Sequence, residues 1–174
     1  MIIGDLIDLR PIVAGDLDRL EAWLAEPEYA GPFNTIGLTN PGTFRAGFAR
    51  DSLLTDDRGT LLIVTKAGEF AGDISYRSVS FGGNRGNNTY ELGITVAAAR
   101  RGRGYGTEAQ RLLAAFLFAT YPIARVQAST DRENIGEQRS LERAGFTREG
   151  TMRQAQFRAG AWHDMIMYSK LRDE

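Results

Sequence analysis

Hydrophobic residues in the first half of the chain follow the spacing of a strand, then of two helices, then of a pair of strands. Leucines recur at helical intervals between residues 17 and 24, and Pro27 marks the end of that helix. Residues 31–42 have the Gly, Pro, Asn and Thr content of a loop, and Ala67-Gly68 favours a hairpin turn. The predicted elements are a strand over 6–12, a helix from 17 that ends before Pro27, a helix over 43–54, and strands over 61–65 and 70–81.

The second half of the chain begins with the clearest alternation in the sequence. Every second residue between 89 and 96 is apolar, so one face of the predicted strand is hydrophobic and the other carries Glu91. An amphipathic helix follows the Gly- and Arg-rich segment 97–106 and ends at Tyr121-Pro122. The remaining predicted elements are a strand over 125–130, a helix over 134–144 closed by Gly145, and two strands within 146–171 that turn at Ala159-Gly160.

The resulting order is β-α-α-β-β-β-α-β-α-β-β, with no repeat and no linker-like segment. Such mixing of strands and helices predicts an α/β domain. The chain has 174 residues, of which 43% are hydrophobic and 25% charged, as is usual for one globular domain. We therefore expect a single domain over residues 1–174.

Composition removes several kinds of chemistry. The chain has no cysteine and a single histidine, His163, which excludes disulfides, cysteine nucleophiles and zinc sites built from cysteine or histidine clusters, so we expect no metal. A net charge of −1 gives no electrostatic reason to expect nucleic acid as a partner. The first residues do not resemble a secretory signal, and the best apolar run, 112–124, is too short to cross a bilayer. We expect a cytoplasmic protein with no membrane partner.

Residues 101–106, Arg-Gly-Arg-Gly-Tyr-Gly, stand where the predicted strand gives way to a helix. Unpaired N–H groups and the positive end of the helix dipole favour an anion there, and glycines let the backbone approach it closely. Arg100, Arg101 and Arg103 add positive charge, so a pyrophosphate fits the junction. The dinucleotide fingerprint fails because Thr107 stands where its third glycine belongs, and no P-loop motif is present.

At this junction the sequence resembles the GNAT N-acetyltransferases, whose acetyl-CoA signature is Arg or Gln, two residues, Gly, one residue, then Gly or Ala. Arg101, Gly104 and Gly106 fill it. The resemblance extends over nearly the whole chain and is strongest to the ribosomal-protein N-terminal acetyltransferase branch. The segments that carry it are L-I-D-L-R-P, Y-E-L-G-I, N-I-G-E-Q-R-S-L-E-R-A-G-F and R-E-G-T-M-R. The resemblance implies one GNAT domain, a mostly antiparallel central sheet of about seven strands flanked by about four helices, and acetyl-CoA as cofactor.

The resemblance also implies which residues bind acetyl-CoA. Val96 and Ala98 should lend backbone groups to the pantetheine arm, and Asn134 stands where this branch has a cofactor-contacting asparagine. Other interpretations remain open: Arg100 also fits a solvated basic turn, and Asn134 with Glu137 has the form of a helix capping box. The residues expected at the pyrophosphate are Arg101, Gly102, Arg103, Gly104, Tyr105 and Gly106, of which Arg103 fits the solvated turn as well.

Acetyl transfer to an amine requires a neutral nitrogen, a polarised thioester carbonyl and a proton for the departing thiolate. Glu91 is the candidate catalytic base, because it lies on the polar face of the strand that leads to the junction, and family members often place a carboxylate on that strand. Glu91 also fits a structural role as the partner of an arginine. Asp73, on the neighbouring predicted strand, is a second candidate that could bind the substrate amine instead.

The proton donors that the resemblance implies are replaced in this chain. The tyrosine expected seven residues after the asparagine is Leu141, and the serine that the ribosomal-type branch often has three residues after it is Glu137. Tyr105, Tyr168 and water remain as alternatives, and the thiolate could also leave unprotonated. For His163, beyond the last hairpin turn, we expect a role in packing or in a substrate loop.

The absence of cysteine favours direct attack of an amine over an acetyl-enzyme intermediate. The resemblance points to a protein N-terminal α-amine, with small-molecule amines (an antibiotic, a polyamine or an amino acid) as an alternative and a non-catalytic acyl-CoA sensor as another. Acceptor-site residues are expected in loops 28–42 and 82–88 and in the last hairpin. The resemblance also makes a homodimer through edge strands of the C-terminal half plausible.

Overall fold

The computed structural model describes residues 1–34, 40–83 and 88–174. Its strands are β1 (Ile2–Ile3), β2 (Ile7–Pro11), β3 (Arg58–Thr65), β4 (Phe70–Ser80), β5 (Asn88–Val96), β6 (Arg125–Asp131), β7 (Thr147–Arg158) and β8 (Ala161–Leu171). Its helices are α1 (Leu17–Leu24), α2 (Pro27–Ala30), α3 (Thr43–Asp51), α4 (Tyr105–Thr120) and α5 (Ile135–Arg143), with 3₁₀ turns at Ala14–Asp16 and Ala98–Arg100. In this described part the strands form one eight-stranded sheet in the order β1-β2-β3-β4-β5-β6-β8-β7.

The centre of the sheet contains a short parallel pairing. Within the described residues, β5 and β6 are the parallel neighbours and every other neighbouring pair is antiparallel. The β5–β6 register runs only from Tyr90 opposite Val126 to Leu92 opposite Ala128. Both strands continue beyond this register, β5 to Val96 and β6 to Asp131. Their C-terminal halves therefore separate, which opens the sheet between them.

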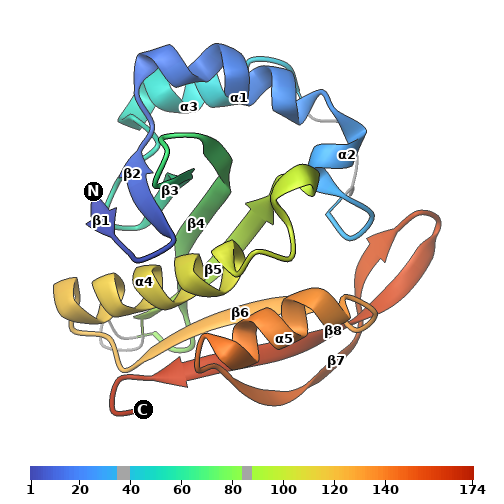
Figure 1. Ribbon diagram of the computed structural model, residues 1–174. Helices are drawn as coiled ribbons and strands as arrows, with labels where there is room; N and C mark the ends of the chain where they lie inside the picture. The colour runs from blue at the N-terminus through green and yellow to red at the C-terminus, as the bar shows by residue number, and fades with distance from the viewer. Residues whose placement is uncertain (35–39, 84–87) are drawn as a thin grey trace.

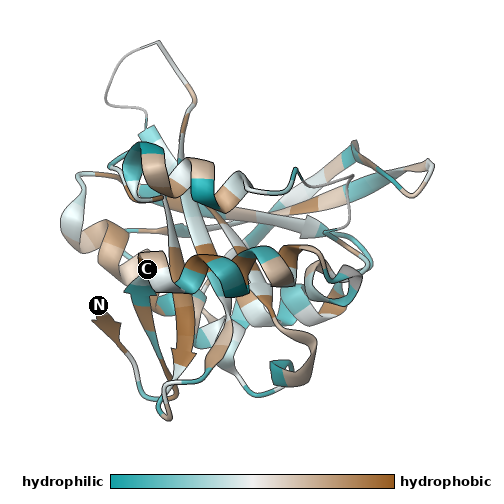
Figure 2. Ribbon diagram, turned by 90° about the horizontal axis from the view of Figure 1, so that it is seen from above, coloured by the Kyte–Doolittle hydropathy of each residue, from teal (hydrophilic) through white to brown (hydrophobic). Residues whose placement is uncertain are grey.

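Two groups of helices cover opposite faces of the sheet (Figure 1). Helices α4 and α5 pack on the face that holds the larger core, where Leu113, Leu117 and Leu141 are fully buried against strand residues such as Ile74. Helices α1 and α3 cover β3 and β4 on the other face through a smaller core around Leu20. Figure 2 shows hydrophobic residues gathered along the strands beneath these helices. Among the described helices, none has the length and apolar character that crossing a bilayer requires.

The predicted α/β class and mostly antiparallel sheet are confirmed. Two short elements exceed the predicted counts of strands and helices: the two-residue β1, which precedes the expected first strand, and α2. The sequence pattern ended the first helix before Pro27, and the structure starts α2 at that proline. Proline suits the first position of a helix because its missing N–H would lack a helical partner there in any case.

A buried glutamate ties the turn between β1 and β2 to α4. Glu108 lies in the first turn of α4, and its carboxylate accepts hydrogen bonds from the backbone N–H groups of Asp5 at 2.7 Å, Leu6 at 2.8 Å and Ile7 at 2.8 Å. An acidic side chain is also favourable at the positive end of the helix dipole. The contact holds the start of the chain against the helix that begins at the glycine-rich junction.

Replacing Glu108 with alanine should leave these N–H groups without their acceptor. We expect Glu108→Ala to lower the free energy of unfolding by about 3 kcal/mol, because hydrogen bonds to a charged group contribute about 1.5–3 kcal/mol each and a buried donor left unpaired is costly. Urea unfolding followed by circular dichroism measures the change. Glu133→Ala, at an exposed position, is the matched control and should change stability by no more than about 0.5 kcal/mol. Equal effects of the two substitutions would contradict this role of Glu108.

Candidate functional site

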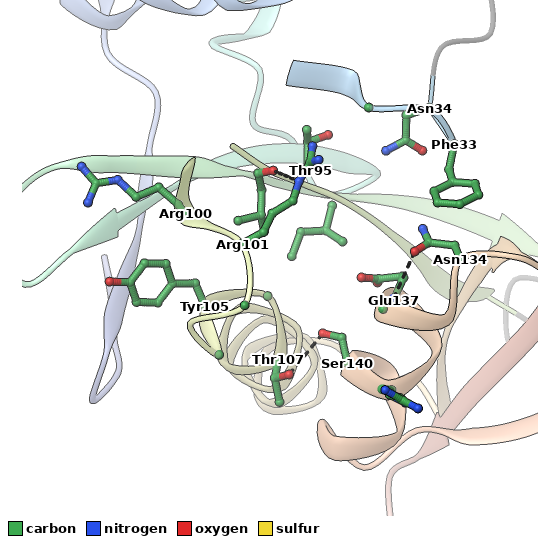
Figure 3. Close-up of a pocket in the computed structure, with 18 of the residues that line it drawn as sticks. Phe33, Asn34, Thr95, Arg100, Arg101, Tyr105, Thr107, Asn134, Glu137 and Ser140 are labelled. Carbon is green, nitrogen blue, oxygen red and sulfur yellow. Dashed lines mark hydrogen bonds between the residues drawn. The ribbon is translucent and has the colours of Figure 1, made fainter. Parts of the chain in front are cut away.

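A cavity of about 520 Å³ opens where β5 and β6 separate, between the loop after α2 and the facing starts of α4 and α5. Such a volume is typical of a small-molecule site. Figure 3 shows Arg100 and Tyr105 toward one end of the pocket and Phe33, Asn34 and Asn134 toward the other. The lining residues are Ala30, Gly31, Pro32, Phe33, Asn34, Ile94, Thr95, Val96, Arg100, Arg101, Gly102, Gly104, Tyr105, Gly106, Thr107, Asn134, Gly136, Glu137, Arg139, Ser140 and Arg143.

The glycine-rich junction lies at one end of the pocket and has the geometry of an anion site. Gly104 occupies the N-cap of α4 with φ of 82°, in the left-handed region that favours glycine. Gly106 lies in the first turn, and a Cβ there would come within 3.4 Å of Ser140 Oγ and 3.6 Å of Val96 Cγ2. The missing side chain therefore leaves a cradle beside first-turn N–H groups that have no acceptor within the helix. This geometry fits the pyrophosphate of a coenzyme A thioester.

Arg101, a predicted cofactor residue, has a guanidinium group that is occupied by backbone carbonyls. It donates to the carbonyl oxygens of Val96 at 2.9 Å, Tyr29 at 3.3 Å and Glu28 at 3.4 Å, and so holds α2 to the end of β5. Arg101 still lines the pocket, but its side chain positions the wall. Arg100, which also lines the pocket, pairs with Glu69 at 3.0 Å.

The other predicted cofactor residues divide into two groups. Val96, Gly102, Gly104, Tyr105, Gly106 and Asn134 all line the pocket, as does Arg101. Ala98 and Arg103 are outside the lining set. Two arginines that were not predicted, Arg139 and Arg143, contribute positive charge to the pocket from α5.

The first turn of α5 corrects part of the capping-box prediction. Asn134 Oδ1 accepts a hydrogen bond from the backbone N–H of Glu137 at 3.2 Å, so the asparagine caps the helix as expected. The Glu137 carboxyl does not return to the backbone of Asn134, whose N–H bonds to Asp131 O at 3.0 Å. It turns instead toward Gln110 of α4, with which it forms a hydrogen bond. The reciprocal half of the box is therefore replaced by a contact between helices.

That contact belongs to a chain of hydrogen bonds across the α4–α5 interface. The Gln110 side chain is buried and links Glu137 to Ser140, whose Oγ lies 3.1 Å from Gln110 Oε1 and 3.2 Å from Thr107 Oγ1. Burial raises the pKa of the Glu137 carboxyl to about 7, against an opposing contribution from the Gln110 hydrogen bond. A large fraction of Glu137 is therefore protonated at neutral pH.

A second buried acid lies beside the α2 wall of the pocket. Asp73 on β4 stands opposite Thr95 of β5, which lines the pocket, and accepts a hydrogen bond from the hydroxyl of Tyr29 on α2. Burial raises the pKa of Asp73 to about 6, while the Tyr29 hydrogen bond opposes the rise. Above that pH Asp73 is mainly a carboxylate that is suited to an ammonium group.

Glu91, the predicted base, is outside the pocket lining. Its Oε1 accepts from Arg77 at 2.8 Å and its Oε2 from the Gln127 side chain at 3.0 Å. Glu91 is thus the partner of an arginine, and its role as base stays a prediction. Glu91 precedes Thr95 by four residues, which corresponds to about 13 Å along a strand. These contacts begin a cross-strand ladder that we define as Arg77, Glu91, Gln127, Arg125, Glu149 and Ser169.

The alternative proton donors are placed differently. Tyr105 lines the pocket near the junction, whereas Tyr168 is fully buried and its hydroxyl donates to Glu142 at 3.1 Å. Leu141, which replaces the expected tyrosine, is part of the core. His163 belongs to a network with Arg158 and lies outside the pocket lining.

That network joins the last hairpin to the loop after α2, which lines the pocket. Arg158 at the end of β7 pairs with the buried Asp131, donates to Pro32 O at 2.7 Å and lies 5.4 Å from the ring centre of Phe33. Asp131, Glu133 and His163 are near enough to share a cation, but Arg158 already neutralises Asp131, so the expectation of no metal stays a prediction. The predicted acceptor loops include residues 35–39 and 84–87, which lie outside the described residues.

Sequence reasoning did not predict the Tyr29–Asp73 pair, the Gln110–Glu137 contact or the Arg158–Pro32 contact. Their partners are separated by 44, 27 and 126 residues respectively. The only sequence signal was the substitution of Glu137 for the serine that the ribosomal-type branch often has. The spacing of polar residues along the sequence does not show which distant residue each of them will contact in the folded protein.

Comparison with known proteins gives the family. A model of the acetyltransferase (GNAT) domain matches residues 7–147. The uncharacterized N-acetyltransferase p20 of Bacillus licheniformis is 23% identical over 171 residues, covering 97% of this chain and 94% of that protein. The probable N-acetyltransferase YjcK and the uncharacterized N-acetyltransferase YnaD, both of Bacillus subtilis, match over shorter stretches. They are 36% and 28% identical, and the matches span only 40% and 52% of their lengths.

Two solved structures of enzymes with different acceptors show the same fold. Spermidine N-acetyltransferase from Vibrio cholerae, in complex with CoA and spermine, has a TM-score of 0.83 at 13% identity over 98% of each chain. An acetyl transferase of Salmonella typhimurium, which modifies the N-terminal serine of ribosomal protein L7/L12, has a TM-score of 0.78 at 20% identity, covering 97% of this chain and 96% of that chain. Ribosomal-type enzymes are thus among the similar proteins, in line with the branch predicted from the motifs.

The family match spans most of the chain, and the motif Arg101, Gly104 and Gly106 lies where it can receive a pyrophosphate at the start of α4. The chain belongs to the GNAT acetyltransferase family, whose cosubstrate is acetyl-CoA.

Proposed function

We propose that this protein transfers the acetyl group of acetyl-CoA to the N-terminal α-amine of a protein or peptide. The observation that carries the proposal is the neutral acceptor end of the pocket: Phe33, Asn34 and Thr95 line it among the described residues. A polyamine carries several positive charges and calls for several carboxylates, whereas Glu137 is the one acid in the described lining. An uncharged wall suits a peptide N-terminus, which brings one amine and a polar backbone.

The protonation chemistry supports the same acceptor. An α-amine with a pKa near 8 is about one tenth neutral at pH 7, while a lysine amine near 10.4 is neutral in only about one part in a few thousand. The candidate base Glu91 is already engaged by Arg77 and Gln127. An α-amine therefore depends less on Glu91 than a lysine amine does, and Glu91 then serves to take up the proton that the attacking nitrogen releases.

In the proposed reaction, the first turn of α4 holds the pyrophosphate, and backbone groups at the end of β5 align the pantetheine arm. The neutral amine attacks the thioester carbonyl directly. Glu91 takes the proton released by the amine through intervening water, or Asp73 accepts it from the α2 side. Arg101 fixes the wall between these positions through its contacts to Val96 O and Tyr29 O.

Asp73 favours a second candidate function. Its carboxylate, paired with Tyr29 next to Thr95, offers one buried anionic contact for the ammonium of a small-molecule amine. The fold likeness to a spermidine acetyltransferase is compatible with this alternative. A non-catalytic acyl-CoA sensor would bind the cofactor without releasing thiol in the presence of any amine.

The acceptor proposal predicts the outcome of a thiol-release assay with matched substrates. A peptide with a free N-terminus and no lysine should give acetyl-CoA-dependent thiol release, and its N-acetylated counterpart should give none. Spermidine and a lysine-containing peptide with a blocked N-terminus should react at least about tenfold more slowly at pH 7, because their amines are mostly protonated. A preference for spermidine would support the small-amine candidate, and binding without any thiol release would support the sensor.

The pyrophosphate cradle predicts a selective loss of cofactor binding in Gly106→Val. The valine methyl groups would fill the space beside Ser140 and Val96, whereas the φ of Gly106 is not in the left-handed region, so folding should persist. CoA at about a hundred times its Kd should raise the Tm of the wild type by about 5–10 °C and that of the variant by none. Gly150→Val, at an open position outside the pocket, is the matched control and should keep the full shift. A full shift in Gly106→Val would place the site elsewhere.

The role of Glu91 predicts a loss of turnover with little loss of cofactor binding. Glu91→Gln should lower kcat about 100-fold at pH 7, with a smaller deficit at pH 9 where more of the amine is neutral. Glu149→Gln removes another carboxylate of the same ladder and is the control for a purely structural effect. Asp73→Asn, measured in parallel, tests the second candidate base. Similar losses at both pH values, or equal losses in the Glu91 and Glu149 variants, would remove Glu91 as base.

A further inference from the structure

Glu137 is an acid inside the pocket that the proposed reaction does not yet use. It lies in the first turn of α5 and lines the cavity. Figure 3 shows its carboxyl group directed from α5 into the pocket, nearer to the Asn134 end than to Tyr105 at the glycine-rich junction. A coenzyme A thioester whose pyrophosphate lies at the junction would extend its thioester end toward this part of the pocket.

The two oxygens of the Glu137 carboxyl have different environments. Oε1 accepts a hydrogen bond from Gln110 Nε2, and the orientation of that amide is set because Gln110 Oε1 accepts from Ser140 Oγ at 3.1 Å. Oε2 has no hydrogen-bond partner among the described residues. Every fully buried side-chain oxygen in the described residues has a hydrogen-bond partner. Because Oε2 has none, it is not fully buried, and it is accessible from the pocket that Glu137 lines. The carboxyl is thus held by one oxygen and presents the other to a ligand.

No cation neutralises this carboxyl within the described residues. Arg100 pairs with Glu69, and Arg101 donates its hydrogen bonds to backbone carbonyls. Arg139 and Arg143 line the pocket, but neither comes within 4.0 Å of the Glu137 carboxyl. From α4 its partner is the neutral Gln110, and the β5 residues that line the pocket are uncharged. A partly buried acid without a counterion favours its neutral form, which carries a proton on the oxygen that faces the pocket.

We propose that Glu137 donates the proton that the departing thiolate of coenzyme A takes up. This inference rests on the proposed function, because it assigns a role within the acetyl transfer. As the amine nitrogen bonds to the carbonyl carbon, the carbon–sulfur bond breaks and its electron pair goes to sulfur. The O–H proton of Glu137 passes to that sulfur, and solvent returns a proton to the carboxylate before the next turnover. The proton lost by the amine goes separately to the base or to water.

The acidities of the two groups match this transfer. A thiol has a pKa near 8.5, so a thiolate is a stronger base than a carboxylate whose pKa is near neutral. Efficient acid catalysis needs a donor that is still protonated at working pH and yet more acidic than the group it protonates. An ordinary exposed glutamate would be ionised and could not donate.

The test compares Glu137→Gln with the matched exposed substitution Glu133→Gln, using whichever amine gives thiol release. Glutamine keeps the shape and the acceptor oxygen for Gln110 but has no transferable proton. We expect kcat to fall about 10- to 100-fold in Glu137→Gln, less than the largest effects of acid catalysis because a thiolate is already a fair leaving group. The Tm shift with CoA should persist. We expect the wild-type kcat to fall above pH 7, and this fall should be absent in the variant. Glu133→Gln should match the wild type in all three readouts.

Wild-type kcat in Glu137→Gln, or a lower kcat that still falls above pH 7, would overturn the inference and leave Glu137 as a packing residue. A loss of the CoA shift would assign it to binding. A second measurement requires neither turnover nor the variant: the carboxyl ¹³C resonance of Glu137 in the CoA complex of the wild type. Titration near neutral pH supports the proposal, and ionisation below about pH 5 overturns it. This measurement stands even where no α-amine is acetylated, so failure of the proposed acceptor is distinguishable from failure of Glu137.

Discussion

The short parallel pairing of β5 with β6 is the constraint on which the rest of the structure depends. The strands share register over three residues and then separate, so among the described residues the last ones of β5 have no strand partner on that side. Exposed backbone groups of a strand must find other partners. Arg101 supplies one by donating to Val96 O, and the same guanidinium holds α2 in place. The separation of the two strands thus creates the pocket. Arg101, which hydrogen-bonds to the free end of β5, also positions the wall of the pocket.

Three glutamates show how environment assigns different roles to the same side chain. Glu108 accepts three backbone N–H groups and anchors the start of the chain to α4. Glu91 meets an arginine and a glutamine in the cross-strand ladder. Glu137 has one neutral partner and one oxygen open to the pocket, and burial raises its pKa to about 7. The charges and the solvent around each carboxyl group therefore decide its role: Glu108 is a structural anchor, Glu91 a member of the cross-strand ladder and Glu137 a candidate acid.

The acceptor end of the pocket is assembled from segments that are distant in sequence. The loop after α2 brings Phe33 and Asn34, and the last hairpin secures that loop because Arg158 bonds to Pro32 O and pairs with the buried Asp131. Figure 1 shows the far end of this hairpin projecting beyond the rest of the sheet. A change in the hairpin therefore reaches the acceptor side through a single buried arginine.

Periodicity and local motifs in the sequence were sufficient for most of the secondary structure, for the α/β class and for the glycine-rich turn that opens α4. The apolar alternation over 89–96 and the glycines at 104 and 106 depend on residues close together in the chain, where spacing directly reflects geometry. Which side chains face one another across the pocket was decided only by the tertiary structure. The capping-box interpretation has Glu137 return to its own helix cap, and in the structure its side chain meets Gln110 instead. Arg101 was predicted at the phosphate, and its side chain binds carbonyls of β5 and of residues 28 and 29. The physical reason is that a polar side chain bonds to whatever group folding brings near it, and for these residues that group comes from another element.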